Sequence, residues 1–203
     1  MQVRTSLVIF AILMASIIAV GCGSPRLGRV PTSVVALYDE AAPDGAMELE
    51  IDRDGTIREA EADIPPEALP ENVRAAAEAF LPGAVITGAE RELTTRGDAW
   101  EVKMRHDDRD WELVIDKKGR VMETEKSLGR TEVPHQVLDA ADAAVTGGLI
   151  QSHEIIERAK GPTEYHVKKS KGGAVYKIVI SEDFVVIRKV REARAEIEIP
   201  LLD

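Results

Sequence analysis

The stretch Trp111–Glu125, WELVIDKKGRVMETE, carries the pattern that decides the fold. Its apolar residues Trp111, Leu113 and Ile115 stand at alternate positions, which predicts a β-strand with one buried face. The segment Asp116–Gly119, DKKG, then predicts a tight turn, and the apolar alternation resumes after it. The stretch is therefore predicted to be a β-hairpin.

The hairpin pattern occurs again on both sides of this stretch. Residues 47–57 show the same alternation and turn glycine 64 positions earlier, and residues 176–186 show the alternation 65 positions later. Two alanine-rich segments, 69–86 and 133–150, also align without a gap at an offset of 64. Each has a proline near its start, a glycine past its end and apolar residues at helical spacing, so each predicts a helix.

Segments with strand-like alternation follow each predicted helix. They are Val85–Leu93, Ala99–Arg105, Trp111–Ile115 and Val121–Glu125, and then Leu149–Ile156, Glu164–Lys168, Val175–Ile180 and Phe184–Arg191. The predicted fold class is α+β, with two tandem units of one helix packed on an antiparallel sheet of about four strands. We expect a partial repeat of a strand and a hairpin at 33–63, a first unit at 64–130, and a second unit with a C-terminal strand at 131–203.

The N-terminal residues predict export and a lipid anchor. Arg4 precedes the apolar run Leu7–Val20, which has the length of a signal-peptide core. The sequence Ala19–Cys22, AVGC, resembles the lipobox of bacterial lipoproteins. We therefore expect a signal peptide at 1–21, diacylation of Cys22 with fatty acids such as palmitate, and a tether at 22–32 on the periplasmic side of the envelope. The outer membrane is favoured over the inner one. An ordinary secretory signal or an uncleaved anchor is the alternative.

Composition limits the classes of partner and of activity. The chain has 36 acidic against 26 basic residues, a formal net charge of -10. This balance argues against nucleic acid and is compatible with cationic peptides, cationic protein patches or divalent cations. The sequence has no serine nucleophile elbow, glycine-rich phosphate loop or H-E-x-x-H motif. We therefore predict that the protein is not an enzyme and has no cofactor.

Several short motifs resemble one family. The helix start Leu69–Ala76, the triplet Pro82–Ala84 and the segments Trp100–Val102 and Trp111–Gly119 are similar to PepSY-like, β-lactamase-inhibitor-like domains of exported bacterial proteins. The resemblance covers Ile64 to about Glu192. It implies small α+β modules that bind peptidases or other envelope proteins and have no common active site. The second unit departs from the pattern because SEDF stands where the first has DKKG, which puts its tight turn in doubt.

The two faces of the predicted sheet suggest a binding surface. Trp100, Trp111, Tyr165 and Tyr176 occupy equivalent positions in the two units, and they form either core or an aromatic strip that binds protein. Alternation places Trp111 against the helix and Glu112 on the opposite, outward face. The outward polar residues are then Glu101, Lys103, Glu112, His166, Lys168 and Lys177.

Metal binding is a weaker possibility. Within residues 50–61, Asp52, Asp54 and Glu61 match ligand positions of an EF-hand loop. A hairpin turn is the favoured interpretation, because a strand rather than a helix precedes these residues.

The predicted function is a non-enzymatic, membrane-anchored lipoprotein that binds an unknown envelope protein or peptide. Inhibition of that partner is one version of this function. The alternatives are a structural or assembly lipoprotein without a ligand site and a cation-binding protein.

Overall fold

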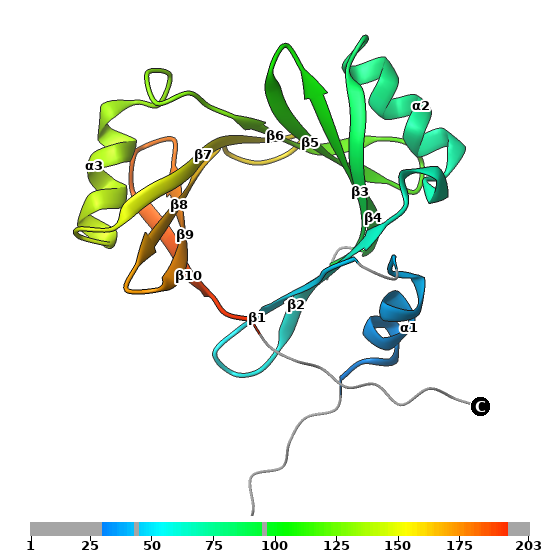
Figure 1. Ribbon diagram of the computed structural model, residues 1–203, viewed down its shortest axis with the longest axis horizontal. Coiled ribbons are helices and arrows are strands. Elements are labelled where there is room, and N and C mark those ends of the chain that lie inside the picture. The colour runs from blue at the N-terminus through cyan, green and yellow to red at the C-terminus, as the bar shows by residue number, and fades with distance from the viewer. Residues whose placement is uncertain (1–29, 43–44, 95–96, 195–203) are drawn as a thin grey trace, which may run out of the picture.

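The computed structural model describes residues 30–42, 45–94 and 97–194 (Figure 1). Their regular elements, in chain order, are α1 (Thr32–Glu40), β1 (Met47–Ile51), β2 (Ile57–Ile64), the 3-10 helix η1 (Pro66–Ala68), α2 (Glu71–Phe80), β3 (Val85–Thr94), β4 (Gly97–His106), β5 (Arg109–Asp116), β6 (Val121–Ser127), α3 (His135–Ala144), β7 (Leu149–Arg158), β8 (Glu164–Lys171), β9 (Ala174–Ser181) and β10 (Val186–Glu192).

All ten described strands form one antiparallel sheet in chain order, from β1 to β10. The expected α+β arrangement of two separate four-stranded units is therefore wrong, and the protein is mainly β. The physical reason is that β6 pairs with β7, from Glu123 opposite Arg158 to Ser127 opposite Glu154. This pairing joins the two halves, and β1 and β2 extend the sheet at its other end.

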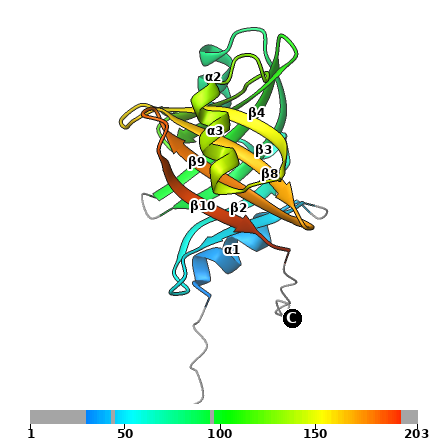
Figure 2. The same cartoon turned by 90° about the vertical axis from the view of Figure 1, so that its left-hand side faces the viewer.

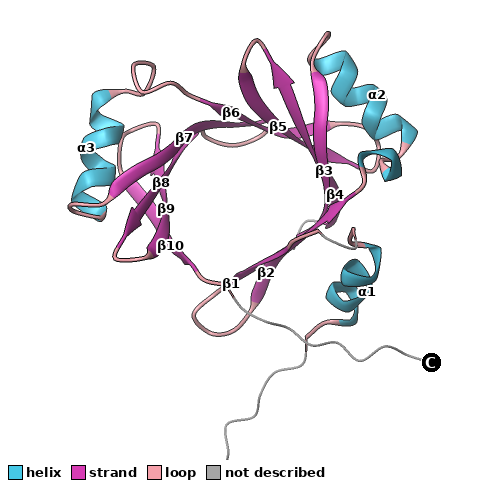
Figure 3. Cartoon of the chain, in the orientation of Figure 1, coloured by secondary structure: helices cyan, strands magenta, loops and turns pink. Residues whose placement is uncertain are grey.

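The sheet is strongly curved, and the three α-helices lie on its outer side (Figures 1 and 3). Figure 2, turned by 90°, shows α3 on the outer side of the strands that follow it. The curvature brings the two edge strands near each other. Arg188 of β10 forms an ion pair with Glu50 of β1, although 138 residues separate them. The outer face is therefore convex and the inner face concave.

The helices α2 and α3 are the two that the alanine-rich segments predicted. Both begin after a proline, Pro70 or Pro134, in an extended conformation. Gly83 and Gly147 follow their ends with φ of 85° and 72°. A glycine accepts this left-handed conformation without steric penalty, so it suits the chain reversal after a helix.

Residues 32–40 form a helix, so the strand that we expected before the hairpin in the segment 33–63 is wrong. Val34 and Leu37, three positions apart, are buried against Ala60 and Ala62 of β2. Burial of this apolar pair outweighs the modest preference of valine for strands. The segment 33–63 is consequently a helix followed by two strands.

Three small cores lie between the helices and the convex face. In the first, Val73 and Ala77 of α2 pack against Val102, Leu113 and Ile115. The second joins α3 to β8 and β9, and the third joins α1 to β1 and β2. Since each core uses the residues of one strand face, the alternate residues project to the concave face.

The turns of three hairpins, β1–β2, β5–β6 and β9–β10, keep one geometry despite their different sequences. Gly55, Gly119 and Phe184 hold equivalent positions with φ of 90°, 73° and 63°. In the last turn the Phe184 N–H donates to the Ser181 carbonyl, as the Gly119 N–H does to Asp116. The tight turn is thus retained in the second unit, with a phenylalanine in a conformation that favours glycine.

The predicted signal peptide and Cys22 lie outside the described residues, as does most of the predicted tether. In the part of the chain that the structure describes, no helix is long and apolar enough to cross a membrane.

Candidate binding site on the concave face

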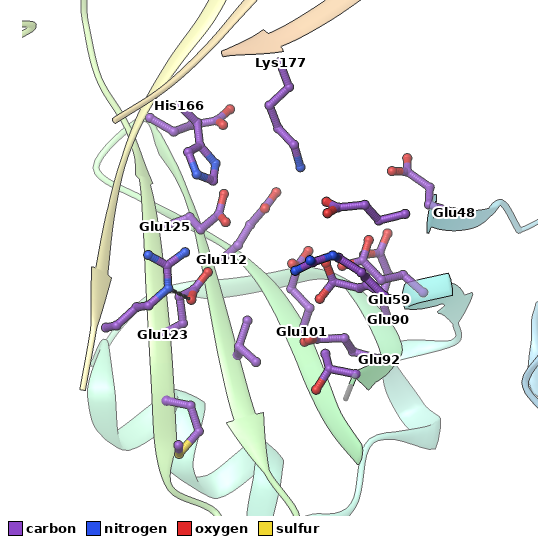
Figure 4. Close-up of a pocket in the computed structure, with 18 of the residues that line it drawn as sticks. Glu48, Glu59, Glu90, Glu92, Glu101, Glu112, Glu123, Glu125, His166 and Lys177 are labelled. Atoms are coloured by element: carbon purple, nitrogen blue, oxygen red, sulfur yellow. Dashed lines mark ion pairs between the residues drawn. The ribbon is translucent and has the colours of Figure 1, made fainter. Parts of the chain in front are cut away.

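Charged side chains of the concave face line a cavity of about 410 Å³ (Figure 4). Eleven glutamates contribute to it, together with six lysines or arginines and one histidine. The glutamates are Glu48, Glu50, Glu59, Glu61, Glu90, Glu92, Glu101, Glu112, Glu123, Glu125 and Glu154. Before any proton binds, the lining therefore has five more negative than positive charges.

The two signs of charge come from different parts of the sheet. All the lining glutamates except Glu154 belong to β1–β6, and we call this group the acidic wall. Four of the six cations come from β7–β10, and they are Arg158, Lys168, Lys177 and Arg188. Figure 4 shows Lys177 reaching into the space opposite the acidic wall.

Several of the cations are occupied by local ion pairs. Lys103 binds Glu90, and its Nζ lies 4.0 Å from Glu101 Oε1. Arg158 Nε is 2.5 Å from Glu123 Oε2, and Arg158 Nη1 is 2.9 Å from Glu164 Oε2. These pairs leave part of the acidic wall without a cation.

Glu59, Glu61 and Glu92 form the densest carboxylate group of that wall. One oxygen of each lies within 4.8 Å of the others, and within the described residues no ion pair involves any of the three. Glu92 is only 4% exposed, and its Oε2 has no hydrogen-bond partner. Together these facts identify an acidic group, buried at Glu92 and half-buried at Glu59 and Glu61, that lacks an ion-pair partner among the described residues.

Burial and repulsion between carboxylates raise the pKa values of Glu61, Glu92 and Glu101. Burial, then the charges of Glu59 and Glu90, raise the pKa of Glu61 to about 8. Burial and a hydrogen bond with Glu59 raise the pKa of Glu92 to about 9. Burial also raises the pKa of Glu101 well above its usual value. Because the charged forms are disfavoured, part of the wall is protonated near neutral pH.

A second group of possible ligands lies where the two halves of the sheet meet. Oxygens of Glu125 and Glu154 and a ring nitrogen of His166 lie within 4.8 Å of one another. Burial is the main cause of both pKa shifts here, raising the pKa of Glu125 to about 8 and lowering that of His166 to about 3. The histidine is therefore neutral at physiological pH.

The structure separates the predicted site residues by face. Glu112 lines the concave cavity, whereas the four aromatics are partly buried and pack against the convex cores. Trp100 and Trp111 also lie beneath cations, with Arg91 at 5.2 Å and Lys126 at 5.1 Å from the ring centroids. The structure does not bring Trp100, Trp111, Tyr165 or Tyr176 to the face that carries Glu112.

The residues that alternation placed on the outward face all line the cavity. They are Glu101, Lys103, Glu112, His166, Lys168 and Lys177. What the sequence did not indicate is the curvature, which turns a broad outward surface into the wall of a concave space.

The EF-hand-like match does not assemble a common site. Asp52 Oδ2 accepts a hydrogen bond from Arg58 Nε at 2.6 Å, and Asp54 Oδ1 accepts one from the Thr56 N–H at 2.9 Å. Glu61 instead belongs to the acidic wall, beside Glu59 and Glu92. Asp52 and Asp54 thus stabilise their hairpin turn.

Most of the acidic wall was missed in the sequence, although a signal for it exists. Pairs of glutamates two positions apart occur in four strands, at 48 and 50, 59 and 61, 90 and 92, and 123 and 125. Spacing of two puts both carboxylates on one strand face. In one such pair, Glu90 and Glu92, both side chains are buried.

Comparison with known proteins places part of this fold in a family. Residues 70–122 match the model of the family described as PepSY, "Peptidase propeptide and YPEB domain". No curated protein matches the chain. The matched segment runs from the residue before α2 to the second residue of β6.

Solved structures share the fold at low sequence identity. A DUF2874 family protein of Bacteroides uniformis is 19% identical, with a TM-score of 0.51 over 61% of this chain and 89% of its own. A protein of Bacteroides eggerthii, provisionally described as periplasmic, is 16% identical, with a TM-score of 0.51 over 60% and 88%. A BLIP-like protein of Bacteroides fragilis is 19% identical, with a TM-score of 0.49 over 68% and 96%. As the sequence motifs predicted, this chain contains a PepSY-like domain, at residues 70–122.

Proposed function

We propose that the protein is a non-enzymatic binding module of the bacterial envelope that receives a lysine or arginine side chain of a partner polypeptide in its concave cavity. One observation carries this proposal, namely the group of half-buried Glu59 and Glu61 with buried Glu92, to which no described lysine, arginine or histidine forms an ion pair. The PepSY-like domain and the periplasmic description of one structural neighbour support the class of function and the compartment.

The energetics favour a cationic occupant. An ammonium or guanidinium group placed among the three carboxyls would allow Glu61 and Glu92 to ionise and would donate charge-assisted hydrogen bonds, which are stronger than neutral ones. A volume of about 410 Å³ falls within the range of roughly 300–1,000 Å³ that is usual for small-ligand pockets. The cavity therefore suits one or two side chains of an extended segment rather than a folded domain.

Anchoring and inhibition fit the same proposal. Lipidation of Cys22 would hold the module at the membrane, since two or more acyl chains provide stable anchoring. A basic segment held in the cavity would be withheld from other contacts of the partner. Inhibition would then follow from sequestration and would require no chemistry from the module.

Fluorescence anisotropy with a labelled peptide tests this proposal. We expect a short arginine- and lysine-containing peptide to bind, and binding to weaken as salt screens the charges. A matched peptide with glutamine at the cationic positions should not bind. The double variant Glu61→Gln/Glu92→Gln should weaken binding at least about tenfold, the equivalent of roughly 1.4 kcal/mol.

The control removes the same charge from the convex side. Glu71→Gln/Glu78→Gln changes two exposed residues of α2 and should leave peptide affinity unchanged. Equal binding of both peptides, or equal loss in both double variants, would refute a cation-specific cavity. Failure of all cationic peptides to bind would favour the structural or assembly role.

A further inference from the structure

Three side chains from consecutive strands converge where the halves of the sheet join. Glu125 comes from β6, Glu154 from β7 and His166 from β8, and one potential ligand atom of each lies within 4.8 Å of the others. Glu154 and His166 are direct cross-strand partners, so their side chains leave the sheet side by side. Figure 4 shows the His166 ring and the Glu125 carboxylate facing the same part of the cavity.

His166 supplies a second, independent observation. The residue is 5% exposed, yet its Nε2 has no hydrogen-bond partner. The carboxylate oxygen of Glu164 is 3.6 Å away and is paired with Arg158 at 2.9 Å. A buried polar group without a partner is destabilising, and an imidazole nitrogen is a common metal ligand. The His166 ring therefore lies beside two carboxylates and carries a buried nitrogen that has no hydrogen-bond partner.

We infer that Glu125, Glu154 and His166 bind a divalent first-row transition-metal ion of the zinc class. One imidazole and two carboxylates suit such an ion better than calcium or magnesium, which take oxygen ligands only. Zinc bonds of roughly 2.0–2.2 Å in a tetrahedron put ligands about 3.4 Å apart. From separations of at most 4.8 Å, the ligand atoms must therefore close in by no more than about 1.4 Å. A fourth position remains for water or a ligand from a partner.

Lys177 is the main competitor for this site. It lines the same cavity, into which its side chain reaches in Figure 4, and its charge contributes to the lowered pKa of His166. Its positive charge would repel a metal ion held by the three ligands. The variant Lys177→Met should accordingly bind the ion more tightly than the native protein, which a purely surface-bound ion would not show.

Titration of the untagged, chelator-treated full chain with Co²⁺ tests the inference, with visible absorption as the readout and Zn²⁺ as the competitor. We expect one equivalent to bind and Zn²⁺ to displace it. His166→Ala and the isosteric Glu125→Gln should each weaken binding by more than about tenfold. Thermal unfolding of each variant shows whether it is folded.

The matched control is His153→Ala on β7. His153 also has a buried Nε2 without a hydrogen-bond partner, but its strand position directs it to the convex side. Equal loss of Co²⁺ binding in this control, or unchanged binding in folded His166→Ala, would overturn the inference. The metal ligands differ from the residues of the proposed peptide site, so Glu61→Gln/Glu92→Gln should weaken peptide binding and leave Co²⁺ binding intact.

Discussion

At the scale of single residues, Glu92 links stability to pH. Its pKa is about 9 and those of Glu61 and Glu125 are about 8 in the folded protein, against 4.5 for an ordinary glutamate. Between these values the folded state keeps protons that the unfolded chain has lost. Stability contributed by these carboxyls is therefore fully present below pH 4.5 and is lost as pH rises toward 8 or 9.

Other residues make the folded protein less stable as the pH falls. The lowered pKa of His166, about 3 against 6.5, removes stability as pH falls below 6.5. Hydrogen bonds from Arg120 and Arg109 lower the pKa values of Asp116 and Glu132 to about 2, and that stabilisation is lost in acid. As the pH falls from 6.5 to 4.5, the three carboxyls with raised pKa values add more stability than His166 removes. We therefore expect the protein to be most stable on the acidic side of neutrality, near about pH 5.

The variant Glu92→Gln should isolate this effect. Glutamine keeps the shape without a titrating proton, so the variant should gain stability relative to the native protein at pH 8 and lose part of the pH dependence. The slope removed is at most about 1.4 kcal/mol per pH unit. Urea unfolding between pH 5 and 8 measures it, with exposed Glu78→Gln as the control. A native stability that rises from pH 5 to 8 would contradict the assigned protonation.

At the scale of elements, the two glycine turns provide a matched comparison. A Cβ at Gly119 would lie 3.0 Å from the Asn72 carbonyl oxygen of α2, whereas a Cβ at the equivalent Gly55 would meet nothing within 4 Å. Asn72 Nδ2 also donates to the Lys117 carbonyl at 3.1 Å. The β5–β6 turn therefore helps to hold the start of α2.

Gly119→Ala should consequently destabilise the protein more than Gly55→Ala. Both changes put alanine in a left-handed conformation, which costs about 1–2 kcal/mol. Only Gly119→Ala also pushes against α2 and disturbs the Asn72 hydrogen bond. Thermal unfolding measures the stability lost in each variant. Equal losses of stability would show that the β5–β6 turn does not support α2.

The same elements show what the sequence could predict. Alternation around Trp111–Ile115 and the prolines before α2 and α3 were sufficient for the hairpins and two helices, because both signals are local. Helix α1 was missed because its stability depends on Ala60 and Ala62, which follow more than twenty residues later. The turn at Phe184 was uncertain because neighbouring structure imposes a conformation that its residue type disfavours.

At the scale of the whole molecule, the cavity results from curvature that local patterns do not encode. Alternation correctly separated the Trp111 face from the Glu112 face. The concave shape, however, follows from twist accumulated over ten strands, the β6–β7 pairing and the contact of Arg188 with Glu50. The site residues could therefore be assigned to a face, but their convergence and burial required the fold.

The central claim is that the concave face, and not the aromatic convex side, receives a cationic segment. It is tested most directly by NMR of glutamate side-chain carboxyl carbons at pH 7 during titration with the arginine- and lysine-containing peptide. The account predicts that the signals of Glu61 and Glu92 move toward the ionised form, because the bound cation lowers their pKa values. The signals of exposed Glu71 and Glu78 should not move. Unchanged Glu61 and Glu92 signals, with perturbations confined to Trp100 and Trp111, would contradict it.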